Sequence, residues 1–129
     1  MSDNSIANLL VLSALLPATS TSTRTGTGID VTAYDGNVAC IVRSSVGTGT
    51  TPTLDFKLQD SDAVGGTYAD VTGATATQIT DAAEGALNTQ KIVFNANKVK
   101  AFVRVVGTIA GTTPSFINSA EFVGNKQYN

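Results

Sequence analysis

The chain has 129 residues, a formal net charge of −2 and only 14% charged residues, so it offers no basic patch for nucleic acid or an anionic membrane. Its 42% apolar residues can build the core of one domain. Because it has no histidine and one cysteine, a Cys/His zinc site, an internal disulfide and a histidine base for catalysis are excluded within one chain. We therefore expect neither an enzyme nor a cofactor, and neither nucleic acid nor a membrane as a partner.

The N-terminal stretch MSDNSIANLLVLSALLPATS has the apolar centre of a secretory signal, but no Lys or Arg precedes Arg24. It is also too short, and too interrupted by polar residues, to span a bilayer. We expect residues 1–25 to form a segment of their own, either a buried strand or an arm that docks on a partner, ahead of a single β-sandwich domain at 26–129. The side chains expected to make such contacts are Leu9, Leu10, Leu12, Leu15, Leu16 and Arg24.

From residue 29 onward, short apolar stretches alternate with turn residues. The clearest is 53–59, in which Leu54, Phe56 and Leu58 alternate with polar residues, as in a strand with one buried face. In NVACIVR, Cys40 alternates with apolar neighbours in the same way, which indicates a buried side chain and not a reactive thiol. Further strands are expected at 29–31, 38–46, 75–80, 91–95, 101–106 and 115–123.

No segment keeps an apolar period of 3.6 residues over three turns, which argues against a helical bundle and against the crossover helices of an α/β sheet. The pattern predicts an all-β protein. We expect an antiparallel β-sandwich or jelly-roll-like barrel of about eight short strands, with an N-terminal arm.

One phrase occurs twice: GTGTTP at 47–52 and GTIAGTTP at 107–114, each after an apolar stretch that contains Arg43 or Arg104. A phosphate-binding loop needs a Lys followed by Ser or Thr and then a helix, whereas both copies lead through a Pro into a strand. Glycine permits positive φ, and Pro suits the first position of a strand. We therefore expect two similar hairpin loops at one end of the fold.

Three acidic residues, Asp60, Asp62 and Asp70, lie close together in the sequence. The first two match part of a calcium-binding loop, but its other acidic ligands and its flanking helices are missing. We favour turn carboxylates that accept backbone hydrogen bonds, with a weak cation site as the alternative.

Arg43 and Arg104 each interrupt a strongly apolar stretch. Such an arginine can face outward, with its stem over apolar surface and its guanidinium in water. It can also pair with a carboxylate at a subunit boundary, where its planar fork gives geometric specificity. Both interpretations stay open, and both residues are candidates for an interaction site.

Several longer phrases resemble head decoration proteins, also called capsid cement proteins, of tailed bacteriophages. They are VRSSVGTGTTPTLDFKLQDSDAVGGTYADV, KAFVRVVGTIAGTTPSF, the N-terminal LLPA and a tail ending in GNKQY, and the resemblance covers roughly residues 9–128. It implies a non-enzymatic structural protein of the virion that binds the major capsid protein on the outer surface of the capsid. It also implies a homo-oligomer, a trimer at local threefold positions, that stabilises the mature shell.

A second hypothesis is a β-sandwich component of a phage tail or baseplate that acts as a carbohydrate-binding or adhesin module. Such modules use exposed aromatic platforms. The chain has no Trp, and its tyrosines are scattered at Tyr34, Tyr68 and Tyr128, which ranks this hypothesis below the first.

Overall fold

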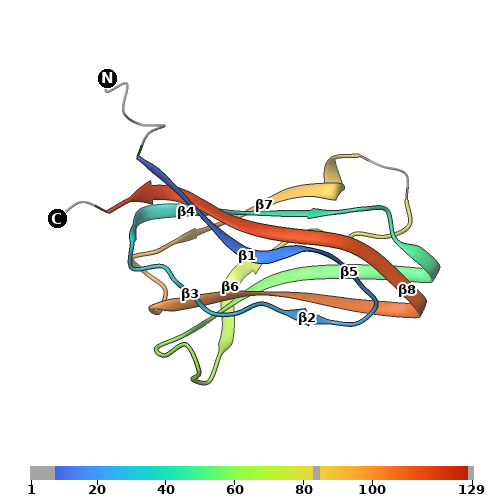
Figure 1. The fold of residues 1–129 in the computed structure, drawn as a ribbon, viewed down its shortest axis with the longest axis horizontal. Helices are drawn as coiled ribbons and strands as arrows, with labels where there is room; N and C mark the ends of the chain where they lie inside the picture. The colour runs from blue at the N-terminus through green and yellow to red at the C-terminus, as the bar shows by residue number, and fades with distance from the viewer. Residues whose placement is uncertain (1–7, 83–84, 128–129) are drawn as a thin grey trace.

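The computed structural model describes residues 8–82 and 85–127. Most of the described chain is strand, and the one helical element is a single 3₁₀ turn (Figure 1). In chain order its elements are β1 (Leu9–Ser20), β2 (Arg24–Thr25), β3 (Ile29–Asp30), β4 (Tyr34–Ser44), β5 (Thr48–Ser61), β6 (Ala69–Thr75), the single 3₁₀ turn η1 (Ala86–Asn88), β7 (Thr89–Asn95) and β8 (Phe102–Lys126).

The 25-residue strand β8 belongs to both layers of the fold. Its second half pairs with β1 on one side and β4 on the other, and β4 pairs with β7. Its first half pairs with β5 and with the short strands β2 and β3, and β5 pairs with β6. We call the layer β1-β8-β4-β7 sheet A and the layer β2/β3-β8-β5-β6 sheet B. All of these pairs are antiparallel, and this double-sheet arrangement is a jelly roll.

The predicted fold class is therefore confirmed, with one difference in the strands. The stretches 101–106 and 115–123, expected as two separate strands, belong to the single strand β8. They are joined because the residues between them continue to pair with β5, as at Thr53 with Ala110 and Thr50 with Thr112. In Figure 1, β8 runs along the lower layer, bends at one end of the molecule and returns along the upper layer.

The two copies of the repeated phrase lie against each other at this bend. Thr50 of the first copy pairs with Thr112 of the second, so both copies lie at one end of the fold as expected (Figure 1), but they are paired strand segments and the expected hairpin form is wrong. The backbone conformation repeats as well, with φ of 106° and 124° at Gly49 and Gly111, and of 48° at both Thr51 and Thr113. The first copy therefore leads from β4 of sheet A into β5 of sheet B, and the second lies where β8 passes from one sheet to the other. The phrase occurs twice because two paired segments make the same bend.

Glycine is required at this crossing because the two backbones approach closely. A Cβ on Gly49 would overlap the carbonyl oxygen of Thr113. A Cβ on Gly111 would lie 2.8 Å from the carbonyl oxygen of Thr51 and 3.0 Å from Cα of Pro52. Both glycines also have φ values that side chains rarely adopt.

The N-terminal stretch forms the edge strand of sheet A. Residues 9–20 pair with β8 from Leu9 opposite Asn125 to Ser20 opposite Phe116, with two register shifts on the way. Pro17 lies at the second shift, where its missing N–H breaks no ladder bond. Residues 9–20 therefore form a strand of the sheet, which is one of the two expected alternatives. Only Ala14 and Leu15 of this strand are buried. Arg24 and Thr25 form β2 and also pair with β8, so β1 and β2 both belong to the sheets of the fold.

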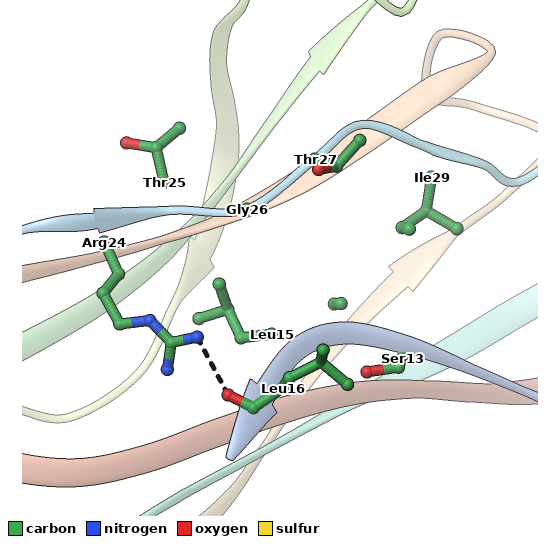
Figure 2. A pocket seen from close by; sticks show the side chains of 9 residues that line it. Ser13, Leu15, Leu16, Arg24, Thr25, Gly26, Thr27 and Ile29 are labelled. Carbon is green, nitrogen blue, oxygen red and sulfur yellow. Dashed lines mark hydrogen bonds between the residues drawn. The ribbon is translucent and has the colours of Figure 1, made fainter. Parts of the chain in front are cut away.

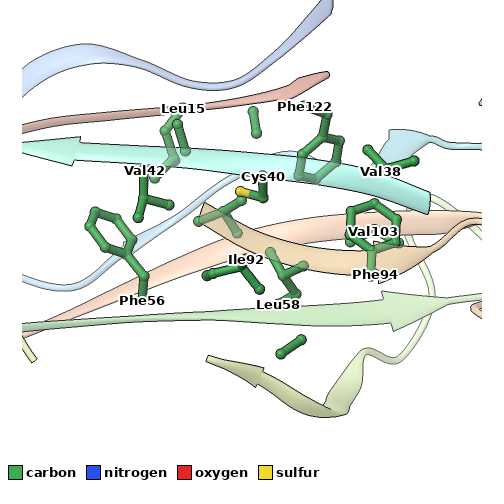
Figure 3. Close-up of a cluster of buried hydrophobic side chains, with 14 of the residues drawn as sticks. Leu15, Val38, Cys40, Val42, Phe56, Leu58, Ile92, Phe94, Val103 and Phe122 are labelled. Carbon is green, nitrogen blue, oxygen red and sulfur yellow. The ribbon is translucent and has the colours of Figure 1, made fainter. Parts of the chain in front are cut away.

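Alternate side chains from both sheets fill the core between them (Figure 3). Phe94 of sheet A packs edge-on against Phe122, with ring centroids 5.4 Å apart. Tyr34, at the start of β4, is also buried, and the single proton of its hydroxyl is shared between the carbonyl oxygens of Leu10 (3.0 Å) and Phe122 (3.1 Å). Burial raises the pKa of Tyr34 to about 12. This hydrogen bond ties β1, β8 and β4 together inside the core.

We expect Gly111→Ala to lower the free energy of unfolding by about 1–3 kcal/mol, because the added Cβ would strain the backbone where the two phrases cross. Denaturant titration measures the loss. Gly65→Ala is the matched control: nothing lies within 4 Å of the position of its Cβ, so its stability should change by at most about 0.5 kcal/mol. Equal stabilities of the two variants would contradict the close crossing.

Candidate interaction surface

The outward side of sheet A, which we call the outer face of sheet A, collects most of the large exposed apolar side chains in the described residues. Strand alternation directs these side chains away from the core. By contrast, Val64 lies in the loop after β5 and Leu87 in η1. The exposed apolar residues of the outer face of sheet A are Leu9, Val11, Leu16, Val93 and Ile117.

Four of the outward residues form a continuous row across all the strands of this sheet. The pairing places side by side, from β1 to β7, Val11, Val123, Ala39 and Val93. Neighbouring strands lie about 4.8 Å apart, so these side chains touch along the row. We call this set the valine row. Contiguous apolar surface of this kind marks an interaction site more often than isolated apolar residues do.

Charged side chains lie beside the valine row. Two residues beyond Ala39 on β4, Ile41 lies between Glu121 of β8 and Lys91 of β7. Arg43 follows two residues later on β4 and is exposed. It lines two shallow hollows of about 260 and 270 Å³, which Pro17 and Ser119 also line. Among the described residues, neither Arg43 nor Glu121 has an ion-pair partner. The outer face of sheet A thus joins apolar surface to charged groups that can bind a partner.

Arg24 lies elsewhere, at a groove of about 520 Å³ between β1 and the short strands β2 and β3 (Figure 2). Its guanidinium donates to the carbonyl oxygen of Leu16 (2.8 Å), and to both the carbonyl oxygen (3.1 Å) and Oδ1 (2.9 Å) of Asn118. Asn118 is buried and donates in turn to Ser20 Oγ at 2.6 Å. Arg24 therefore connects the edges of the two sheets and satisfies an edge carbonyl that would otherwise face solvent.

Arg104 lies on the opposite side of the molecule, on the outer face of sheet B. It donates twice to Oε1 of Gln59, at 2.9 and 2.8 Å, and lies 4.0 Å from the centre of the Tyr68 ring. Gln59 donates to Asp70, which also pairs with Lys57 at 3.0 Å. The hydrogen bond from Gln59 and the contact with Lys57 lower the pKa of Asp70. These groups satisfy one another, so this face is less suited to a partner than that of sheet A.

The structure does not gather the three acidic residues into a cation site. Asp60 accepts a hydrogen bond from the backbone amide of Lys100, while Asp70 is held by Gln59 and Lys57. Asp60 and Asp70 line a groove of about 460 Å³ between β6 and β7, together with the cationic Lys98. Within residues 8–82 and 85–127, no three acidic, histidine or cysteine side chains cluster as metal ligands.

The tyrosines give little support for a sugar platform. Tyr34 is buried in the core, Tyr68 is covered by Arg104, and Tyr128 lies outside the described residues. The large exposed apolar side chains of the described chain are all aliphatic.

The leucines predicted to make contacts divide between the two sides of β1. Leu15 is buried and Leu10 and Leu12 pack against the core, whereas Leu9 and Leu16 are exposed on the outer face of sheet A. The structure adds Val11, Val93 and Ile117, on β1, β7 and β8, to this surface. Their role is not visible in the sequence, because each lies in an ordinary alternating strand and joins the others only through the pairing.

This chain matches no family model, and a search of curated proteins likewise finds no match. In the part of the chain that the structure describes, no helix has the length and apolarity needed to cross a membrane.

Arg24→Ala should lower the free energy of unfolding by about 1–3 kcal/mol, because the buried Asn118 loses its charged donor. Thermal or denaturant unfolding measures this loss. Arg43→Ala is the control: Arg43 is exposed and has no ion-pair partner among the described residues, so the change should stay within about 0.5 kcal/mol. A larger loss for Arg43→Ala than for Arg24→Ala would reverse these roles.

The Cys40 thiol should resist labelling in the folded protein. It has no exposed surface, and burial together with the nearby Glu121 raises its pKa to about 12. We expect a thiol reagent at pH 8 to leave the native protein unlabelled and to label it fully in denaturant. Cys40 is the only cysteine, so no other thiol contributes to the signal. Rapid labelling of the native protein would show that β4 opens at this position.

Proposed function

We propose that this protein is a structural component of a phage virion that binds the outer surface of the capsid and stabilises the mature shell. The first support is the resemblance of residues 9–128 to head decoration proteins. Its most distinctive pieces are LQDSDAVGGTYADV at 58–71, RVVGTIAGTTP at 104–114 and the N-terminal LLPA, and the second of these runs through the bend of β8. Jelly rolls occur in viral capsid proteins but also in lectins and other proteins, so the fold alone does not choose among these functions.

The observation that carries the proposal is the contrast between the two outer faces. Sheet B presents polar groups that bind one another, from Arg104 through Gln59 to Asp70. Sheet A presents the valine row beside Arg43 and Glu121, which have no ion-pair partners among the described residues. A face of that kind resembles a protein interface, with an apolar centre and a polar rim. A small protein that bears such a face is suited to adhere to another protein surface.

The proposed partner is the major capsid protein in its mature lattice. A protein that binds only the assembled state stabilises that state by mass action, and the effect grows with the concentration of the free protein. The resemblance implies that the protein acts as a homotrimer at local threefold positions. In that arrangement, each copy would bridge neighbouring shell subunits.

The alternative, a carbohydrate-binding or adhesin module of the tail, has weaker support. A sugar site needs aromatic rings that lie open to solvent, and the two described tyrosines are buried or covered.

The decisive experiment mixes the purified protein with mature capsids and with procapsids of the phage that encodes it, followed by sedimentation of the particles. We expect binding to mature capsids only, together with greater resistance of those capsids to heat or chelators. Binding to neither particle would refute the proposal. Selective binding to sugars on a glycan array would instead favour the tail module.

A further inference from the structure

We propose that the outer face of sheet A binds the same face of a second copy of this chain, around a two-fold axis that runs along the strands between β4 and β8. This inference does not depend on the proposed function, because it concerns the free protein in solution. The second copy occupies the face that the proposed function assigns to the shell protein, so the dimer must separate before that face can bind a capsid. It follows from the order of residues across the four strands.

The valine row is complementary to itself under this symmetry. A two-fold axis between the two central strands exchanges β1 with β7 and β8 with β4 and keeps each row in place. Val11 then meets Val93 of the second copy, and Val123 meets the smaller Ala39. Large side chains thus oppose small ones at the centre, and two valines pack at each end. Sheets that stack in this way lie about 10 Å apart, which is the distance that such side chains fill.

The charges are complementary under the same symmetry. Arg43 lies on β4 and Glu121 on the neighbouring strand β8, offset from each other by two residues along the strands. The axis therefore places Arg43 of one copy next to Glu121 of the other, twice per dimer. An arginine side chain is long enough to reach across an offset of two strand residues, about 7 Å. Neither group has an ion-pair partner among the described residues, so the dimer supplies both.

The size of the face sets the strength of the contact. Four strands about 4.8 Å apart and seven residues of about 3.3 Å each give a face of roughly 19 by 23 Å. This is smaller than the approximately 800 Å² per partner of a standard stable interface. The face therefore supports a weak dimer that forms with rising concentration.

A two-fold contact joins one surface to itself, whereas a threefold ring joins two different surfaces. The dimer contact is thus compatible with the trimer that the resemblance implies. In either case, association through sheet A yields a species with twice the mass found at high dilution.

Sedimentation of the full chain over a range of concentrations tests the proposal. We expect the wild type to double in mass, and Val93→Lys to weaken this association by at least about tenfold, because a lysine ammonium would be buried without a partner. Val64→Lys is the matched control: Val64 is a valine of nearly the same exposure, 54% against 51%, but lies in the loop after β5. Circular dichroism checks that both variants fold.

The charge pair gives a test specific to a second copy. Arg43→Glu alone and Glu121→Arg alone should each weaken self-association, because like charges would then meet across the axis. Mixing the two variants should restore it, because in the mixed dimer both contacts again join opposite charges. The double variant should also associate like the wild type.

Three results would overturn the proposal: a wild type whose mass stays constant up to about millimolar concentration, equal behaviour of Val93→Lys and Val64→Lys, or no restoration on mixing. If Val93→Lys abolished capsid binding without changing the sedimentation, the face would belong to the shell protein and not to a second copy. Capsid binding that fails at high dilution, where the protein is monomeric and the face is free, would refute the proposed function and leave this inference standing.

Discussion

The pairing of β8 along its whole length is the constraint on which the rest of the structure depends. This one strand lies at the centre of both sheets, and every other strand except β6 and β7 pairs with it directly. It can serve both layers only because it bends, together with β5, where Gly49 and Gly111 let two backbones cross closely. The repeated Gly-Thr phrase is thus the element that turns one long ribbon into a sandwich.

The bend also determines what each face of the molecule presents. Because folding the ribbon turns one side of every strand inward, alternate residues form the core and the others form the two outer faces. On sheet B the outward residues satisfy one another around Gln59. On sheet A they leave the valine row and Arg43 facing outward. The polar groups on the outer face of sheet B thus bind one another, whereas the outer face of sheet A is suited to bind a partner.

Local patterns in the sequence predict the all-β class, the burial of Leu54, Phe56 and Leu58, and the burial of Cys40, and the structure confirms each of these. The continuity of β8 could not be predicted, because Gly107–Pro114 has the composition of a loop and becomes a strand only through its pairing with β5. The valine row could not be predicted either. Its four members come from four strands, and only the register brings them into line.

The place of β8 in the chain has a consequence for folding during synthesis. The ribosome makes β8 after all the other described strands, yet within the described chain β1, β2 and β3 pair with nothing else. Before β8 emerges, only the pairs β4-β7 and β5-β6 can form, and an isolated pair of strands is marginal in water. The nascent chain must therefore wait for β8 to close its core, with the leucines of β1 exposed meanwhile. Contacts between residues far apart in the sequence form slowly, so this fold is most vulnerable to aggregation just before β8 is made.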